Sequence, residues 1–70
     1  MEITIRDEFI KLGQLLKLAG IAGSGIDAKI MIENGEVTVN GETELRRGKK
    51  IREGDVVAAD GTTITVKSLM

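Results

Sequence analysis

The fold is decided by one stretch near the middle of the chain, Gly35-Glu36-Val37-Thr38-Val39-Asn40-Gly41. Val37 and Val39 alternate with polar residues, which is the pattern of a strand with one buried face. Asn40-Gly41 is typical of a type I′ hairpin turn, because that turn needs positive φ at both central residues. Gly35 tolerates the left-handed backbone that ends many helices. The stretch therefore predicts the end of a helix, a strand and a tight turn.

On the N-terminal side of this stretch the hydrophobic period is helical. A first helix is predicted after Asp7, a plausible N-cap, and ends at Gly20; its inward side chains fall at helical spacing, at Phe9, Leu12, Leu15, Leu16 and Ala19. A second helix is predicted from Ser24, which with Asp27 forms a shortened capping box, to about Asn34. Its inward candidates are Ala28, Met31 and Ile32. The alternation of Ile3 and Ile5 predicts a short strand over 1–5.

On the C-terminal side the sequence alternates between turns and β-branched runs. Strands are predicted over 43–45, 56–59 and 62–69, with a turn at Gly54-Asp55 and a second type I′ hairpin at Asp60-Gly61. The chain is thus expected to be one α+β domain over residues 1–70, in which two short helices pack on a small, mainly antiparallel sheet with hairpins at Asn40-Gly41 and Asp60-Gly61.

The composition excludes several functions. The 70 residues include no Cys and no His, so disulfides, zinc fingers and imidazole-based catalysis are not available. The acids are scattered without calcium-loop spacing, so no metal site, cofactor or catalytic residue is expected, and the chain is not expected to be an enzyme. The single Phe argues against binding single strands by base stacking.

The hydrophobic runs are only a few residues long, so no membrane-spanning segment is expected. The N-terminus has no hydrophobic stretch behind a basic region, so no signal peptide is expected either. We therefore expect a cytoplasmic bacterial protein, and we expect it to be a monomer.

Charge is concentrated in one segment, residues 46–52, which we call the basic segment. It carries five of the ten cations of the chain, although the net charge is only −1. One interpretation is phosphate contact through Arg and Lys side chains. The other is a solvated strand edge that blocks pairing with another sheet. The five cations are Arg46, Arg47, Lys49, Lys50 and Arg52.

Other candidate anion contacts lie on the predicted helices. The turn that contains Ser24 and Gly25 opens the second helix, and free amides at a helix start attract anions. Lys11 and Lys17 lie on a flank of the first helix, and Lys29 lies early in the second. Taken alone, the turn is more simply an ordinary Ser-capped helix start, and the lysines are more simply solubilising surface residues.

The spacing of these features has a known counterpart. From Lys11 the chain carries a Leu-rich helix ending at Gly20, then Ser24 and Ala28, the run Gly35 to Gly41, and a closing Gly54-Asp55-x-Val57. With this pattern residues 11–57 resemble the small RNA-binding module first seen in ribosomal protein S-four, the S-four or alpha-L domain. The basic segment and the Gly-Asp that follows it resemble the stand-alone bacterial subgroup of that family.

The resemblance implies a non-enzymatic protein that binds structured RNA, either rRNA or tRNA, with a role in ribosome assembly or translation. The implied contacts are the cations named above together with Ser24, Gly25 and Asn40. The chain departs from the family where Gly25 replaces the usual Arg and Gly13 replaces Asp. Our hypothesis is that binding has shifted toward the basic segment and Lys29, with the amides of Ser24 and Gly25 in place of the guanidinium.

Two alternatives remain beside RNA binding. The first is a protein-interaction adaptor whose basic segment docks on an acidic partner. The second is a β-grasp carrier, but such carriers end in Gly-Gly, whereas this chain ends in Ser68-Leu69-Met70.

Overall fold

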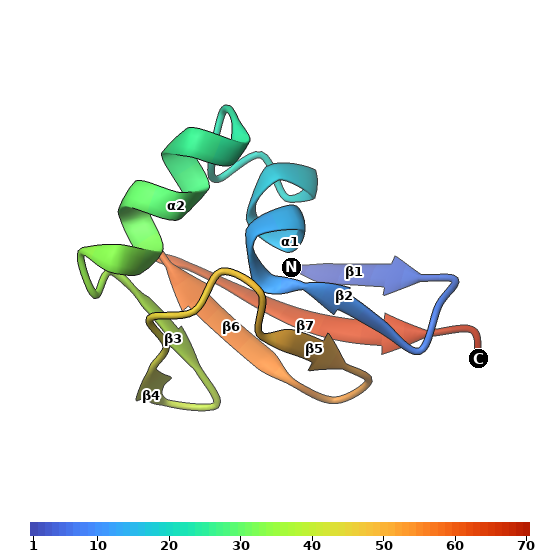
Figure 1. Cartoon of the computed structure of the whole chain (residues 1–70). Helices are drawn as coiled ribbons and strands as arrows, with labels where there is room; N and C mark the ends of the chain where they lie inside the picture. Colours follow the sequence, from blue (N-terminus) through green and yellow to red (C-terminus); the bar gives the residue numbers. More distant parts are fainter.

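The computed structural model describes all residues from 1 to 70 and places two helices on one side of a five-stranded sheet (Figure 1). The strand order is β1-β7-β6-β3-β4, and β2 and β5 form a separate antiparallel pair. The α+β class and the mainly antiparallel sheet are confirmed. The elements are β1 (Glu2–Ile5), β2 (Phe9–Lys11), α1 (Leu12–Leu18), α2 (Gly25–Glu33), β3 (Val37–Val39), β4 (Glu42–Thr43), β5 (Lys50–Arg52), β6 (Val56–Ala59) and β7 (Thr62–Ser68).

Both predicted hairpin turns are confirmed. Asn40 and Gly41 have φ of 53° and 85°, and Asp60 and Gly61 have φ of 50° and 72°. The first turn joins β3 to β4 and the second joins β6 to β7. The strand expected over 43–45 is shorter than predicted and ends at Thr43. On its other side β3 pairs with β6, so the hairpins are neighbours in one sheet.

The second helix begins and ends as predicted. The Ser24 hydroxyl oxygen accepts a hydrogen bond from the Asp27 amide at 3.1 Å. Gly35 follows the helix with a φ of 77°. Ala28 and Ile32 are buried, and Met31 is partly buried against the core. The local sequence signals are therefore sufficient to place this helix.

The predicted start of the first helix is wrong, because Asp7 does not cap it. Residues 9–11 form β2, which pairs with β5 in the register Phe9↔Arg52, Ile10↔Ile51 and Lys11↔Lys50. The helix begins only at Leu12, and the Lys11 side chain makes no capping hydrogen bond. Pairing with residues 50–52 gives residues 9–11 the hydrogen bonds of a β-ladder in place of those of a longer helix. A contact between distant parts of the chain therefore overrides the local helical periodicity.

The core lies between the helices and the sheet. Nine large side chains are fully buried there: Leu12, Leu15, Leu16, Ile32, Val37, Ile51, Val57, Ile64 and Val66. Every element except β2, β4 and β1 contributes to this set, and Ile5 of β1 is buried beside it. β1 is an edge strand of the sheet and pairs parallel to β7, so the first and last strands of the chain are neighbours (Figure 1). Neither helix is long and apolar enough to cross a membrane.

Candidate nucleic-acid interface

The β2–β5 pair has one inner and one outer face. Ile51 is fully buried and Ile10 is packed against the core. Since side chains alternate along a strand, the neighbours of these two residues point to the other side. That outer face therefore carries one aromatic ring and three cations and no acid, namely Phe9, Lys11, Lys50 and Arg52. The ring centroid lies 4.8 Å from Lys50 Nζ and 5.6 Å from the Arg52 guanidinium carbon.

The loop before β5 is fixed to the start of α1. The Leu12 amide donates to the Lys49 carbonyl oxygen at 2.9 Å, and the Gly13 amide donates to the Arg47 carbonyl oxygen at 3.0 Å. These bonds satisfy two of the amides that a helix start leaves free. A Cβ at position 13 would lie 3.6 Å from Arg47 Cβ, so the loop passes close over the helix. The basic segment is therefore a backbone-anchored turn followed by a strand.

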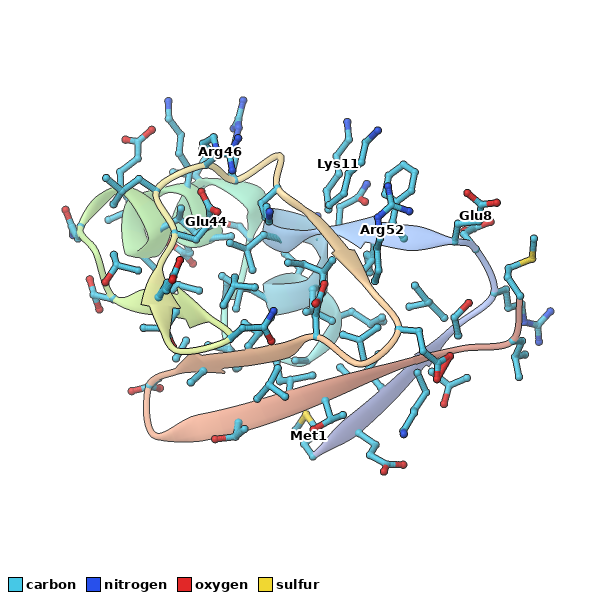
Figure 2. The ribbon with its side chains drawn as sticks, turned by 90° about the horizontal axis from the view of Figure 1, so that it is seen from below. Met1, Glu8, Lys11, Glu44, Arg46 and Arg52 are labelled. Carbon is cyan, nitrogen blue, oxygen red and sulfur yellow. The ribbon has the colours of Figure 1, made fainter.

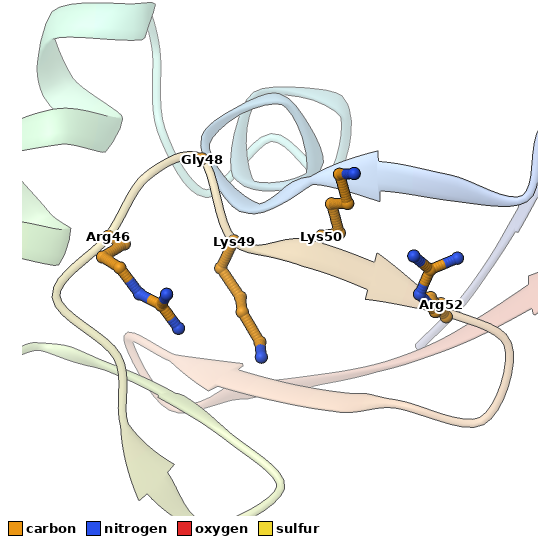
Figure 3. Close-up of a pocket in the computed structure, with 5 residues that line it drawn as sticks. All are labelled: Arg46, Gly48, Lys49, Lys50 and Arg52. Carbon is orange, nitrogen blue, oxygen red and sulfur yellow. The ribbon is translucent and has the colours of Figure 1, made fainter.

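Most of the basic segment surrounds one open depression of about 560 Å³. In Figure 3 the side chains of Arg46 and Lys49 extend in one direction, whereas Lys50 and Arg52 lie toward β2. No hydrophobic side chain lines this depression, which we call the basic groove; its lining is Arg46, Gly48, Lys49, Lys50 and Arg52. A polyanion fits such a lining better than an apolar ligand does.

The fifth cation of the segment, Arg47, borders a smaller recess of about 180 Å³. Two lysines of the sequence prediction, Lys11 and Lys17, border the same recess, as does Gly25 at the first turn of α2. Gly13 and Gln14 complete its lining. Figure 2 shows Lys11, Arg46 and Arg52 along one edge of the molecule, on the side opposite to Met1. We call the groove, this recess and the outer face of β2–β5 together the basic face.

Few of these cations are neutralised within the protein. The one ion pair joins Arg46 Nε to a Glu44 carboxylate oxygen at 3.0 Å. This hydrogen bond lowers the pKa of Glu44 below its usual range. The pair therefore stabilises the fold above the ordinary pKa of Glu44, and its contribution is lost as the pH falls through the lowered folded value. Because Arg46 is exposed, that contribution is small.

The acids next to the basic segment are engaged elsewhere. Asp55 accepts from the Asn40 side-chain amide at 3.0 Å and from the Arg52 backbone amide at 2.8 Å. Glu53 accepts from the Ser68 backbone amide at 2.8 Å. These carboxylates shape the turn and leave the side chains of Arg47, Lys49, Lys50 and Arg52 without an ion-pair partner. Those four cations are free to meet an external anion.

Three predicted contacts, Ser24, Lys29 and Asn40, line neither the basic groove nor the recess of Arg47. Lys29 is exposed on α2 but borders neither the groove nor the recess. Asn40 uses both ends of its side chain within the fold, since its Oδ1 accepts from the Val56 amide at 2.9 Å while its Nδ2 donates to Asp55. The Ser24 hydroxyl is engaged as the helix cap. Asn40 nevertheless lies beside the basic groove, since it lines another pocket together with Lys49, whereas Lys29 lines no pocket with any of these cations.

The helical periodicity predicts that Phe9 faces inward from a helix, whereas the structure places it in β2 beside the basic segment. A signal for its true place exists. Lys50-Ile51-Arg52 puts one Ile between two cations, and Phe9-Ile10-Lys11 puts one Ile next to a Lys. Two such triplets match the pairing of one buried and one exposed face.

The chain is similar in sequence and in fold to known proteins. The chain is 49% identical over 59 residues to the "Probable ribosome maturation protein RlbA" of Bacillus subtilis strain 168, covering 84% of this chain and 83% of that protein. It is 42% identical over 57 residues to YbcJ of Escherichia coli strain K12, covering 81% of each.

The solution structure of Escherichia coli YbcJ matches the fold with a TM-score of 0.72 at 36% identity, over 94% of this chain and 85% of that one. That structure is described as revealing an alpha-L motif involved in RNA binding. The family model for the S4 domain, the S-four domain of the sequence pattern, matches residues 3–67. The chain belongs to the S4 domain family.

Proposed function

We propose that this protein is a non-enzymatic RNA-binding protein that recognises structured RNA, and that its basic face is the binding surface. The observation that carries the proposal is the basic groove, which is lined by four cations and no hydrophobic side chain. Of these four cations only Arg46 has a carboxylate partner. The description of YbcJ as a "Putative RNA-binding protein" with an alpha-L motif supports RNA as the polyanion.

Folded RNA suits this surface better than an acidic protein does. Interfaces between proteins gain most of their energy from buried aromatic and other anchor residues in pockets, and the groove offers none. Structured RNA can be recognised through phosphate positions and shape, which requires cations held on a firm backbone. The anchoring of the loop on α1 and of Ile51 in the core provides that firmness.

Within this surface the residues have different tasks. Arg47 and Arg52 can each hold a phosphate with two parallel hydrogen bonds, whereas Lys11, Lys17, Lys49 and Lys50 act as point charges. Arg46 shares its guanidinium with Glu44 and is the weaker contact. The family's Arg is absent at position 25, and the sequence suggests that the amides of Ser24 and Gly25 replace it. We propose that the Arg47 guanidinium acts together with these amides, because Arg47 borders the recess that also reaches Gly25.

We further propose that the RNA is ribosomal and that the protein acts during ribosome assembly. The description of RlbA as a ribosome maturation protein supports this target. Sedimentation of a cell lysate at low salt would place the protein with ribosomal particles or their precursors. Its absence from every ribosomal fraction would contradict the ribosomal target and leave RNA binding itself intact.

The proposal is tested by binding to a labelled RNA hairpin with one bulged adenosine across a salt series. Six phosphate contacts, one for each cation assigned above other than Arg46, predict a slope of log K against log salt of about −5 to −6. The double variant Arg47→Gln, Lys49→Gln should bind more weakly, with a slope smaller in magnitude by about two.

The matched control is the double variant Arg6→Gln, Lys67→Gln. It changes the net charge by the same amount at two exposed positions that border neither the groove nor the recess. The control should keep the slope of the unmodified protein. Equal losses in both double variants would show that the basic face has no special part in binding.

A further inference from the structure

Next to the basic face lies a recess of opposite character. It has a volume of about 430 Å³ and is lined by Asp7, Glu8, Phe9, Gln14 and Met70. None of these side chains is cationic and two are carboxylates. A phosphate group is repelled from such a place, so the recess does not extend the phosphate-binding surface. We call it the Phe9 recess.

Phe9 borders both regions. Phe9 is one of the residues that line the Phe9 recess, and the centroid of its ring lies 4.8 Å from Lys50 Nζ and 5.6 Å from the Arg52 guanidinium carbon. It is the only aromatic residue of the chain and is partly exposed. Lys11, two residues along β2, stands about 6.6 Å farther along the strand on the same face. Phe9 therefore borders both a cationic surface and a recess with two carboxylates.

A nucleotide likewise has two chemically different parts, and each would suit one of these two regions. Its phosphate is anionic, whereas its base is neutral, has a π face and carries hydrogen-bond donors at its edge. Carboxylates accept from the exocyclic amino group of cytosine, and a Gln side chain can pair with the edge of adenine. Asp7, Glu8 and Gln14 offer these groups around the hollow.

We infer that Phe9 is the stacking platform for one unpaired base of the bound RNA, while Lys11, Lys50 and Arg52 hold the phosphates on either side of it. This inference rests on the proposed function and adds a specificity to it. Bases within an A-form duplex are not accessible for stacking, so the protein selects RNA in which a base is extruded at a bulge, loop or junction.

The test compares two hairpins that differ by one base. The first carries a bulged adenosine, and the second carries an abasic nucleotide at the same position, so that both have the same phosphates. The unmodified protein should bind the first at least about fivefold more tightly, since stacking one base on a protein ring gives this much or more. Phe9→Leu should bind both hairpins with the affinity that the unmodified protein has for the abasic one.

The comparison within the unmodified protein needs no variant, so it stands even if Phe9→Leu is unstable. Equal affinity of the unmodified protein for the two hairpins would overturn the inference while leaving RNA binding through the basic face in place. A full base-dependent gain retained by folded Phe9→Leu would overturn it too. Failure to bind either hairpin would overturn both the inference and the proposed function.

Discussion

At the scale of single residues, Gly41 and Gly48 show two different uses of glycine. Gly41 has a φ of 85° in the β3–β4 turn, whereas Gly48 lies in the basic segment outside the positive-φ region. A Cβ would meet nothing within 4 Å at either position. Any difference between substitutions at the two sites is therefore due to backbone conformation and not to crowding.

Gly41→Ala should lower the free energy of unfolding by about 1–2 kcal/mol, because a side chain disfavours the left-handed backbone. Gly48→Ala is the control and should have little effect. Urea unfolding followed by circular dichroism measures both. Equal stability of the two variants would show that positive φ at Gly41 does not constrain the hairpin.

Glu44 is the one acid that competes for a cation of the basic groove. Its carboxylate holds Arg46 Nε at 3.0 Å and accepts from the Arg46 backbone amide at 3.0 Å. Glu44→Gln removes the charge and leaves an oxygen that can still accept from that amide. The affinity for the RNA hairpin should therefore rise, and the salt slope should become steeper because Arg46 is released.

The control for this prediction is Glu2→Gln, which removes an acid from β1, away from the groove. Acidification gives a second test, since protonated Glu44 also releases Arg46. Because the pKa of Glu44 is lowered, this release requires a pH below the usual range of a Glu side chain. An affinity for the hairpin that falls in Glu44→Gln would contradict the assigned competition.

At the scale of elements, β5 connects the core to the basic face. Ile51 is fully buried, while Lys50 and Arg52 on either side of it are exposed. Ile51→Val should lower the free energy of unfolding by about 0.5–1.5 kcal/mol through loss of one buried methyl group. Ile26→Val makes the same change where the side chain is 71% exposed, and should cost only the few tenths expected from helix propensity.

Thermal unfolding of the two Val variants checks this prediction. If Ile51→Val is no less stable than Ile26→Val, then β5 is not anchored in the core as described. The basic side chains would in that case lack the fixed backbone on which recognition of RNA shape depends.

The elements also show where sequence reasoning succeeds and fails. The helix from 25 to 33 and the two hairpins follow from local signals, since Ser24, Gly35, Asn40-Gly41 and Asp60-Gly61 each set their own backbone geometry. β2 could not be found in this way, because its three residues become a strand only by pairing with residues 50–52. Local signals therefore do not predict that Phe9 lies on the outer face of a strand.

At the scale of the whole molecule, the five-stranded sheet is completed by pairing between distant parts of the chain. The parallel pairing of β1 with β7 joins residues 2–5 to residues 65–68, and no local pattern specifies it. The same is true of the recess that joins Lys11 and Lys17 to Arg47. The concentration of charge in residues 46–52 was visible in the sequence, but the neighbours of that segment were not.

We propose that structured RNA contacts the whole molecule at the basic face. Backbone amide chemical shifts of the whole protein, followed by NMR as the bulged RNA hairpin is added, show which surface the RNA contacts. We expect the largest shifts in residues 9–17, 25 and 46–52, with the strand β1 and the second half of α2 around Ile30 unaffected. Shifts concentrated on the second half of α2 or on β1, with residues 46–52 unchanged, would contradict the proposal.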